Sequence, residues 1–476
     1  MLKNTRFFVM DVLAMLLGIQ LKANPTKNQK LILSQWMGCS RLIWNAKCEE
    51  ERYYSTFARK YCPIGTYAPI DQTTSQFKHK LLTPWLYNCP SQILRNSASN
   101  WYQTYQQFIK GSCGKPRRKP KLDAGSIHLT RELFKFEVGM DGVRRLFIGS
   151  KTNNIGYLSF KTHRDFELPN SIYIKKARGR YTVSFCYDNQ DEIQQLTNNE
   201  HLAYLHGASE DYLNQCVIGI DRGVAIPAQV GDSSFDFTDG QKKHQRKAEK
   251  YIKRLQRRLS KQSKGSNRRQ KVKRRIANYH AMSANIRRDF CHKISRALVD
   301  SPSRVFVFED LKTSTMTKRA KPKQDDNGQF ISNRAKQKSG LNKAILSKGW
   351  HQFELFTKYK AHQAGKAVFK VPAAFTSQEC ANCGYTHPNN RQSQSSFHCG
   401  CCGHVDNADR NASVIIKKRA IKLLLDTGTV LSARGVLTLS DKGRGAKGKT
   451  GIGSLVHASG DEPSKKKRTA STKVAA

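Results

Sequence analysis

Acidic residues are scarce in this chain. Its 476 residues include 36 Asp and Glu against 83 Lys and Arg, which gives a formal net charge of +47. Repulsion of this size opposes a compact fold unless a polyanion neutralises part of the charge. An ordinary enzyme has no need of such an excess. The composition therefore indicates a polyphosphate partner, for which nucleic acid is the best candidate.

The sequence also lacks long apolar runs. Outside the N-terminus, no segment is long and apolar enough to span a bilayer. One short run, Phe7–Gly18, lies behind Lys3 and Arg6 and imitates a signal peptide. Asp11 interrupts this run, and no small-residue cleavage site follows it. We therefore interpret residues 1–25 as an N-terminal extension with a first strand, and we expect a cytoplasmic protein with no membrane partner.

The cysteines do not have the spacing of a disulfide framework. Five of the 13 cluster between positions 380 and 402, and the other eight, such as Cys39, Cys113 and Cys291, are scattered. This usage indicates free thiols in a reducing compartment.

The clustered cysteines form two knuckles, Cys380-Ala-Asn-Cys383 and Cys399-Gly-Cys-Cys402, in the pattern C-x2-C-x15-C-x2-C. This spacing predicts one structural Zn²⁺ held by Cys380, Cys383, Cys399 and Cys402. Four thiolates satisfy a tetrahedral ion and leave no open position for catalysis. Cys401 is a spare thiol whose use would spoil the spacing. Zinc ribbons bind DNA, RNA or protein, so the motif alone does not define a function.

Three acidic residues occupy positions typical of metal ligands. Asp221 ends the apolar run that starts at Val217, Glu309 ends the run that starts at Val305, and Asp409 precedes a helical pattern. Mg²⁺ takes oxygen ligands, and two such ions about 3.5–4 Å apart hydrolyse phosphodiesters where carboxylates converge. We therefore predict that these three residues are catalytic and bind two Mg²⁺ ions.

Each acid also has an ordinary interpretation. Asp221 could be a turn residue, and Asp409 could be only the N-cap of the following helix. Asp310 and Asp406 are rival candidates, one and three positions away from the preferred residues. The individual signals are weak, and it is their order around basic helices and a zinc ribbon that favours a metal-dependent nuclease.

Local patterns divide the rest of the chain. Thr26 and Gln29 form a capping box that opens a helical region, and Ala177-Arg-Gly179 predicts a hairpin among strands that form a small β-barrel or β-sandwich. Further along we expect a polar linker at 188–215, two basic helices at about 242–262 and 268–300, a mobile loop at 318–338 and a helix at 346–365. The expected domains are 1–25, 26–113, 114–210, 211–375, 376–405, 406–426 and a disordered basic tail at 427–476.

Taken together, these motifs resemble the TnpB nucleases of bacterial insertion sequences and their relatives, the type V CRISPR effectors. The acidic motifs of that family match Gly219-Ile-Asp-Arg-Gly223, Val307-Phe-Glu-Asp-Leu311 and Asp409-Arg-Asn-Ala-Ser413. The two knuckles match its zinc ribbon, and the likeness extends over most of the chain. Two departures are Arg222, where the family usually has an apolar residue, and Ser413, where alanine is usual.

The resemblance implies a multidomain α+β protein. It would have a helical recognition lobe, a small β-barrel wedge domain and a RuvC-like, RNase H-type α/β nuclease domain with an inserted zinc ribbon. It implies an RNA-guided DNA endonuclease, with a guide RNA and target double-stranded DNA as partners. Three alternatives remain open: a nuclease-inactive RNA-guided repressor, a compact CRISPR effector that uses CRISPR RNA, and a zinc-ribbon RNA-binding protein without DNA activity.

Basic residues and Asn45 are the predicted nucleic-acid contacts, with a solvated charged face as the ordinary alternative for the basic ones. Trp36, Trp44, Trp101 and Tyr105 could stack on bases, but we prefer core positions for them. The predicted contacts are Arg41, Asn45, Lys115, Arg117, Arg118, Lys119, Lys121, Arg254, Arg257, Arg258, Arg268, Arg269, Lys271, Lys273, Arg274, Arg275, Arg287 and Arg288.

Overall fold

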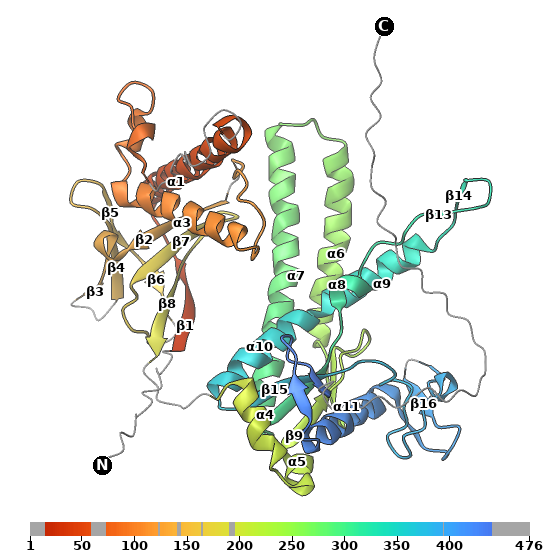
Figure 1. Ribbon diagram of the computed structural model, residues 1–476. Coiled ribbons are helices and arrows are strands. Elements are labelled where there is room, and N and C mark those ends of the chain that lie inside the picture. Colours follow the sequence, from red (N-terminus) through yellow and green to blue (C-terminus); the bar gives the residue numbers. More distant parts are fainter. Residues whose placement is uncertain are drawn as a thin grey trace, which may run out of the picture. The chain divides into compact units, whose positions relative to one another are not determined.

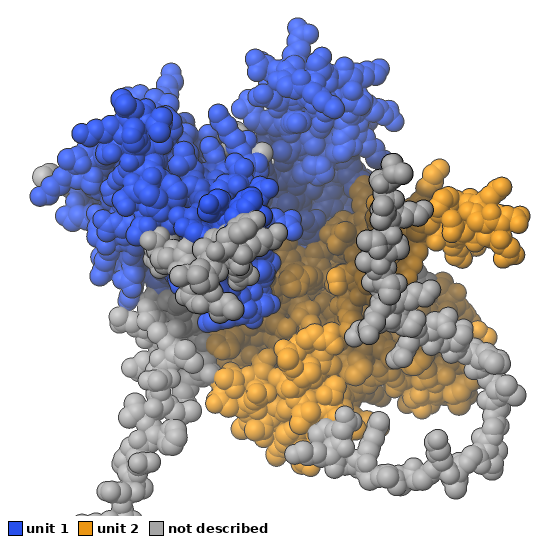
Figure 2. All heavy atoms as spheres, turned by 45° about the horizontal axis from the view of Figure 1, so that its top comes forward, with its two compact units in different colours: residues 1–194, 237–290 blue, residues 195–236, 291–476 orange. Residues whose placement is uncertain are grey.

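The structure is a computed structural model, and it describes residues 15–58, 73–121, 124–139, 144–162, 165–189, 196–393 and 395–439. The chain forms two compact units, which are coloured differently in Figure 2. Unit 1 contains residues up to 194 together with 237–290, and unit 2 contains 195–236 together with the residues from 291 onward. Neither unit is therefore one continuous stretch of sequence.

Unit 1 contains the predicted helical region near the N-terminus. Helix α1 (Lys27–Tyr53) begins after Thr26, whose hydroxyl accepts the Gln29 N–H while the Gln29 side chain accepts the Thr26 N–H. The predicted capping box is thus confirmed. The Gln29 amide also donates to two carbonyls of β5 (Asn154–Leu158), which fixes the start of the helix against a strand. Helix α3 (Ser91–Ile109) packs against α1.

The described strands of unit 1 form two open sheets, not the closed barrel that we expected. One sheet has the order β2-β7-β8-β1-β6, and the other has the order β3-β4-β5. Phe136 on the smaller sheet makes edge-to-face contacts with Phe160 and Phe185 on the larger one. The sheets pack through side chains without a shared ladder, so the sandwich interpretation is the better one. The other strands are β1 (Met15–Ala23), β2 (Ala124–Thr130), β3 (Phe134–Val138), β4 (Arg144–Gly149), β6 (Phe160–Lys161), β7 (Ser171–Ala177) and β8 (Arg180–Asn189).

The predicted hairpin in the larger sheet is confirmed. Strands β7 and β8 are joined by Arg178 and Gly179, which have φ angles of 54° and 74°. Two-residue hairpin turns require positive φ at the first or at both central positions, and their twist matches that of the strands. Arg178 adopts this conformation although it carries a side chain.

The tryptophans of the helical region belong to the core. Trp36, Trp44 and Trp101 are 1%, 9% and 1% exposed, which confirms the core interpretation over base stacking. Tyr105 stacks on Trp101 with ring centroids 5.2 Å apart. The indole of Trp44 is covered by the ammonium group of Lys119, which lies 3.4 Å from the ring centroid. A side chain predicted to contact nucleic acid therefore also packs on the protein.

A long helical hairpin completes unit 1. Helix α6 (Asp239–Ser260) and helix α7 (Asn267–Asp300) run side by side in Figure 1, as the sequence predicted, and α7 continues into unit 2. The rings of Tyr251 and Tyr279 stack between them with centroids 5.2 Å apart. Although α7 has 34 residues, neither it nor any other helix of the described residues is apolar enough to cross a membrane.

Three parallel strands form the centre of unit 2. Strands β9 (Val217–Ile220), β12 (Val305–Glu309) and β15 (Ala367–Val371) lie in the order β15-β12-β9. Their residues are almost all buried, as in parallel sheets covered on both faces. Helix α11 (Ala408–Leu425) packs closely on β9. A Cβ atom on Gly219 would lie 2.2 Å from a backbone carbonyl oxygen of this helix, so only glycine fits.

The linker predicted at 188–215 is wrong, because this stretch contains two helices, α4 (Asn198–His206) and α5 (Glu210–Cys216). The signal that we missed is the pair Thr197 and Glu200, which form a capping box. Leu202, Leu205 and Leu213 are buried against the sheet of unit 2.

The tail predicted to be disordered from 427 begins with a hairpin, β18 (Thr429–Leu431) and β19 (Leu437–Leu439). Leu437 is fully buried, and Val436 pairs with Lys370 of β15. A few apolar residues thus anchor the segment to the core of unit 2. Residues 440–476 of the predicted tail, and residues 1–14 of the predicted extension, lie outside the described part of the chain.

The region between the second acidic motif and the cysteines is also more regular than expected. The predicted loop contains the short hairpin β13 (Lys323–Gln324) and β14 (Phe330–Ile331) after a short helix, α8 (Thr313–Met316). The single helix predicted at 346–365 is two helices, α9 (Ala335–Lys348) and α10 (Trp350–Gln363). They are divided at Gly349, whose φ of 77° ends the first helix.

Candidate functional site

Three acidic side chains line one cavity in unit 2. Asp221 directly follows β9, Glu309 is the last residue of β12, and Asp409 lies in the first turn of α11. Since β9 and β12 are parallel neighbours, their carboxyl ends meet at the same edge of the sheet. The cavity has a volume of about 630 Å³. Arg391, from the cysteine-rich segment (residues 376–405), also lines it. The structure thus brings together the three acids that the sequence singled out.

Burial and mutual repulsion make this cavity unfavourable for three bare carboxylates. Burial, reinforced by the charges of Glu309 and Asp409, raises the pKa of Asp221 to about 8. Burial also raises the pKa of Glu309 and of Asp409, and the Arg391 guanidinium opposes this increase at both. A cation among the oxygens would relieve the repulsion. The oxygen donor set fits a hard cation such as Mg²⁺.

Two residues that sequence reasoning did not assign hold these carboxylates in place. The Thr376 hydroxyl donates a hydrogen bond to Glu309 Oε1, and Arg391 Nη2 lies 3.4 Å from Asp409 Oδ1. Both residues come from segment 376–405. Neither had a distinct signal in the sequence, because threonine and arginine in polar loops are common. The cysteine-rich segment therefore contributes directly to the carboxylate cavity.

The turn after Asp221 requires glycine. A Cβ atom on Gly223 would lie 2.6 Å from the Ile226 carbonyl oxygen and 3.5 Å from Asp409 Oδ2. At the start of α11, the side chain of Asn407 accepts hydrogen bonds from the backbone N–H groups of Asp409 and Arg410. Asn407 is therefore the N-cap, and the alternative role of Asp409 as the cap is wrong.

The two rival acids are engaged elsewhere. Asp310 forms ion pairs with Arg434 at 3.2 Å and with Lys370 at 3.8 Å. Asp406 pairs with Arg410 at 3.3 Å. Neither acid is among the residues that line the carboxylate cavity.

The four predicted zinc ligands converge. The Sγ atoms of Cys380 and Cys402 are 3.7 Å apart, those of Cys383 and Cys399 are 3.6 Å apart, and all four lie within 4.8 Å of one another. Four sulfur atoms about 2.3 Å from a tetrahedral ion are roughly 3.8 Å apart, so the cluster fits Zn²⁺. Among the described His, Cys, Asp and Glu residues, this is the one group that converges so closely. Exposed Cys401 is not part of it.

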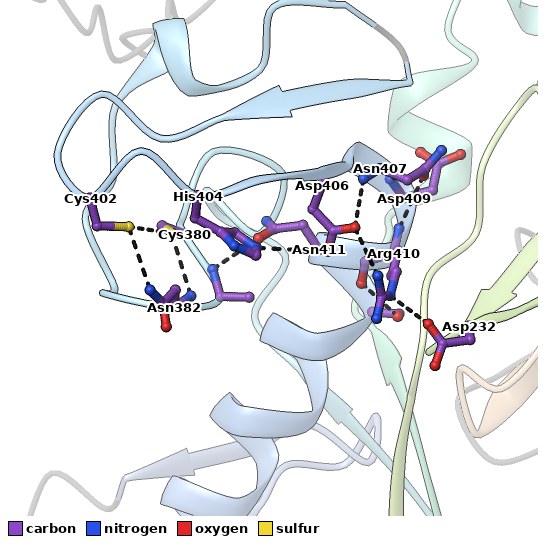
Figure 3. Close-up of polar contacts among 12 residues, drawn as sticks. Asp232, Cys380, Asn382, Cys402, His404, Asp406, Asn407, Asp409, Arg410 and Asn411 are labelled. Carbon is purple, nitrogen blue, oxygen red and sulfur yellow. Dashed lines mark hydrogen bonds and ion pairs between the residues drawn. The ribbon is translucent and has the colours of Figure 1, made fainter.

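The cysteine cluster is linked to the helix that carries Asp409. Asn411 Nδ2 donates to the Glu379 carbonyl oxygen at 2.8 Å, and its Oδ1 accepts the Ala381 N–H at 2.9 Å. Figure 3 shows Cys380 on one side of Asn411 and Asp409 on the other. The same turn of α11 therefore fixes both the knuckle and the third carboxylate.

Four of the predicted nucleic-acid contacts line a second cavity, in unit 1. Arg41 and Asn45 of α1 lie there with Arg118 and Lys121, in a volume of about 750 Å³. Trp85, which is 49% exposed, lines the same cavity. The cavity thus combines cationic groups with an accessible aromatic ring, although the sequence gave no reason to select Trp85.

Part of the predicted basic segment is already neutralised. Lys115 pairs with Glu51 at 2.8 Å, and Arg118 pairs with Glu49 at 3.0 Å. Both acids lie on α1, so these contacts hold the segment 114–121, which contains Pro116 and Pro120, against the helix. The side chain of Arg117 is exposed.

Arginines of the helical hairpin line a third cavity, also in unit 1. Arg254, Arg258 and Arg275 surround a volume of about 860 Å³ together with Arg178 and Arg180 at the β7–β8 turn. We did not predict the last two, although they flank the hairpin glycine in the sequence. The cavity gathers five guanidinium groups around one space.

The remaining hairpin residues differ in their surroundings. Arg269 Nη1 donates to the carbonyl oxygens of Leu259 and Gln262, so this side chain closes the turn between α6 and α7. Arg287 is half-buried. The other predicted contacts are exposed: Arg257, Arg268, Lys271, Lys273, Arg274 and Arg288.

These features define a basic, multidomain α+β protein with a cavity of three carboxylates beside a four-cysteine cluster. Three family profiles match the chain. They are the OrfB helix-turn-helix domain at residues 15–55, the "Probable transposase" profile of OrfB proteins of the IS605 type at 184–320, and the Cas12f1-like TNB domain at 350–416. In the structure, residues 15–55 contain strand β1, the whole of helix α1 and the first two residues of a π-helical turn (Tyr54–Ala58).

Known relatives cover most of the chain. It is 30% identical over 401 residues to "Putative RNA-guided DNA endonuclease InsQ" of Escherichia coli (strain K12), which covers 83% of this chain and 90% of that protein. It is 24% identical over 399 residues to an RNA-guided DNA endonuclease, also named as putative, of Streptomyces pristinaespiralis, covering 82% and 85%. The chain belongs to the OrfB family of IS605-type elements, the TnpB-like proteins.

CRISPR-associated proteins share parts of the sequence and the fold. The CRISPR-associated endodeoxyribonuclease Cas12f1 of Sulfoacidibacillus thermotolerans is 42% identical over 66 residues, which are 13% of this chain and 16% of that protein. A cryo-EM structure of a Cas12f1-sgRNA-target DNA complex aligns with a TM-score of 0.52 and 14% identity, over 82% of this chain and 83% of that one. The second likeness supports the multidomain α+β fold alone.

Proposed function

We propose that the chain is an RNA-guided DNA endonuclease. It would bind a guide RNA, recognise a short motif beside the target, and hydrolyse phosphodiester bonds of double-stranded DNA. The observation that carries this proposal is the cavity lined by Asp221, Glu309 and Asp409 in a chain with a net charge of +47. The names of InsQ and of the Streptomyces relative support the guided activity, and the name of Cas12f1 supports cleavage of DNA.

The three carboxylates would hold two Mg²⁺ ions in a RuvC-like, RNase H-type site. Bound ions would activate a water molecule and stabilise charge on the phosphate. Asp221, Glu309 and Asp409 line one cavity, so their oxygens are available to the same bound ions.

The protein groups around the carboxylates have their own tasks. The Thr376 hydroxyl orients Glu309 through its hydrogen bond to Oε1. The Arg391 guanidinium pairs with Asp409 and lines the cavity, so it is positioned to bind the phosphate of a DNA strand that enters. Backbone pairing between Asp221 and Gln229 at 2.9 and 3.0 Å holds the first carboxylate on its strand end.

The remaining parts of the chain would bind structural zinc and nucleic acid. Cys380, Cys383, Cys399 and Cys402 would hold one Zn²⁺ ion. The two basic cavities of unit 1 would bind guide RNA and heteroduplex phosphates, which need charge but no sequence readout. The proposed domains are a first wedge strand within 1–25, a recognition lobe at 26–113, a wedge domain and linker at 114–210, nuclease segments at 211–375 and 406–426, a target-binding ribbon at 376–405 and a tail at 427–476.

The first test is to purify the full chain, expressed from its own locus, and to sequence the RNA bound to it. We expect one abundant RNA with a structured scaffold and a variable end. DNA that matches the variable end should then be cut in Mg²⁺. Asp221→Asn should abolish cutting, whereas Asp310→Asn, the matched change at a rival acid outside the cavity, should retain it.

Other results would favour the alternatives. Guided DNA binding without cutting by the wild-type protein would indicate a nuclease-inactive repressor. A bound RNA encoded in a repeat array would indicate a CRISPR effector. Heterogeneous cellular RNA alone would refute guidance and leave a zinc-ribbon RNA-binding protein or a non-specific nuclease.

A further inference from the structure

The side chain of Arg222 joins three elements at the carboxylate cavity, and Arg222 is among the residues that line it. Its Nη2 donates to the backbone carbonyl oxygen of Glu309 at 2.5 Å, and its Nη1 donates to Glu354 Oε2 at 2.9 Å. Arg222 is the second residue after β9, Glu309 ends β12, and Glu354 lies on α10. The Arg222 side chain is only 3% exposed. One buried guanidinium therefore connects the ends of two strands to a helix.

The contact between Arg222 and Glu309 lies just beyond the end of the hydrogen-bonded ladder between β9 and β12. The ladder between β9 and β12 ends with the pair Ile220 and Phe308. Asp221 and Glu309 are each one residue further along, so no ladder pair fixes their separation. The hydrogen bond from Arg222 to the Glu309 carbonyl group links the two strand ends at that level.

The surroundings hold the guanidinium in one orientation. Its carbon atom lies 5.2 Å from the centroid of the Phe308 ring. Glu354 also accepts from Lys358 at 2.9 Å and from Lys370 at 2.8 Å, so the carboxylate that anchors Arg222 is itself fixed on three sides. A buried charge is costly unless it is paired, and a planar guanidinium can bind two acceptors at a fixed angle.

We propose that Arg222 is a positioning residue that sets the separation of the Asp221 and Glu309 carboxylates for metal binding, with Glu354 as its anchor. This inference rests on the proposed function. The residues that orient metal ligands typically change metal affinity by about 10- to 100-fold when they are removed. Arg222 would act through the backbone of the strand ends, by its hydrogen bond to the Glu309 carbonyl group.

The test compares variants of the full chain purified with its bound RNA. We would measure Mn²⁺ binding by electron paramagnetic resonance, the Mg²⁺ concentration for half-maximal DNA cleavage, and target binding in EDTA. Arg222→Met should weaken Mn²⁺ binding and raise the Mg²⁺ requirement by about 10-fold or more, while target binding in EDTA changes less than about twofold. Arg222→Lys keeps the charge but loses the planar guanidinium that binds two acceptors, so it should recover only part of the Mn²⁺ affinity.

Lys358→Met is the matched control, because it removes another cation from Glu354 and leaves the link from Arg222 to the Glu309 carbonyl group. Its Mn²⁺ affinity should stay within about twofold of wild type. Glu354→Gln should weaken Mn²⁺ binding, and it carries the test if Arg222→Met does not fold. Wild-type Mn²⁺ affinity in both Arg222→Met and Glu354→Gln, or equal losses in Lys358→Met, would overturn the proposal.

The Mn²⁺ measurement separates this inference from the proposed function. If the wild-type protein fails to cut guided DNA, the endonuclease proposal fails. The dependence of Mn²⁺ binding on Arg222 still decides whether this residue positions the carboxylates. Arg222→Lys with fully wild-type affinity would refute the need for the two-point contact.

Discussion

The guanidinium of Arg391 lies 3.4 Å from the carboxylate of Asp409, although these residues belong to different parts of unit 2. Arg391 comes from the cysteine-rich segment, and Asp409 comes from the first turn of α11. Their side chains are 30% and 9% exposed, so the pair is largely shielded while Arg391 keeps access to the cavity. The cysteine-rich segment therefore contributes to the carboxylate site as well as carrying the four-cysteine cluster.

We predict that Arg391→Ala lowers the cleavage rate by about 100-fold, because a cationic group aimed at the phosphate is lost. Target binding in EDTA should change little, and Arg391→Lys should recover part of the rate. Arg410→Ala is the control: Arg410 lies beside Asp409 in sequence but pairs with Asp232 and Asp406 outside the cavity. Single-turnover cleavage measures the effect, and equal rates for Arg391→Ala and wild type would rule out this role.

The cysteine cluster leads to a prediction about zinc. Cys399→Ser should reduce the zinc content from one ion per chain to a small fraction, because a three-thiolate site binds less tightly and exposes the ion. Cys401→Ser, a matched change at the exposed neighbour, should keep one zinc ion per chain. Mass spectrometry of the metals in purified protein measures both. One zinc ion per chain in Cys399→Ser would contradict the ligand assignment.

The three carboxylates could be predicted from the sequence because each lies at the end of a strand or the start of a helix, where the local pattern is recognisable. Asp221 and Glu309 end apolar strands, and parallel strands bring their carboxyl ends to one edge. Asp409 was the weakest of the three from local pattern, since helix caps are often acidic. The structure resolves this by giving the cap to Asn407.

Contacts between distant residues could not be predicted in the same way. Nothing in the spacing of Arg222 and Glu354 indicates that they pair across 132 positions. The same holds for Thr376 and Glu309. The sheets of unit 1 illustrate the limit for architecture, because alternating apolar residues fit a closed barrel and two packed sheets equally well. The choice depends on which strands share a ladder, and that is a long-range property.

Packing of α11 on the sheet leads to a prediction about stability. Gly219→Ala should destabilise unit 2 by about 2 kcal/mol or more, because the added methyl group meets backbone atoms that cannot move aside. Gly340→Ala in α9 is the control, since its methyl group meets nothing within 4 Å and alanine favours helix. Hydrogen exchange of β9 and α11 peptides should increase only in Gly219→Ala. Unchanged exchange in that variant would show that the helix can shift away from the sheet.

The pairing of Glu354 predicts how stability depends on pH. Burial of Glu354 opposes ionisation, but Lys370, Arg222 and Lys358 outweigh it and lower the pKa of this carboxyl from 4.5 to about 2. A lowered pKa stabilises the fold above the unfolded value, and this contribution is lost as the pH falls from 4.5 towards 2. The shift corresponds to about 3 kcal/mol.

Wild type should therefore exceed Glu354→Gln in unfolding free energy at pH 7 by about that amount, and the difference should shrink below pH 4.5. Urea unfolding between pH 7 and pH 3.5 measures this difference in free energy, with hydrogen exchange of α10 peptides as the signal for unfolding. Glu210→Gln, a change at an exposed carboxylate, should differ from wild type by less than about 0.5 kcal/mol throughout. A difference between wild type and Glu354→Gln that stays constant over this range would contradict the assignment of Glu354 as a charged anchor.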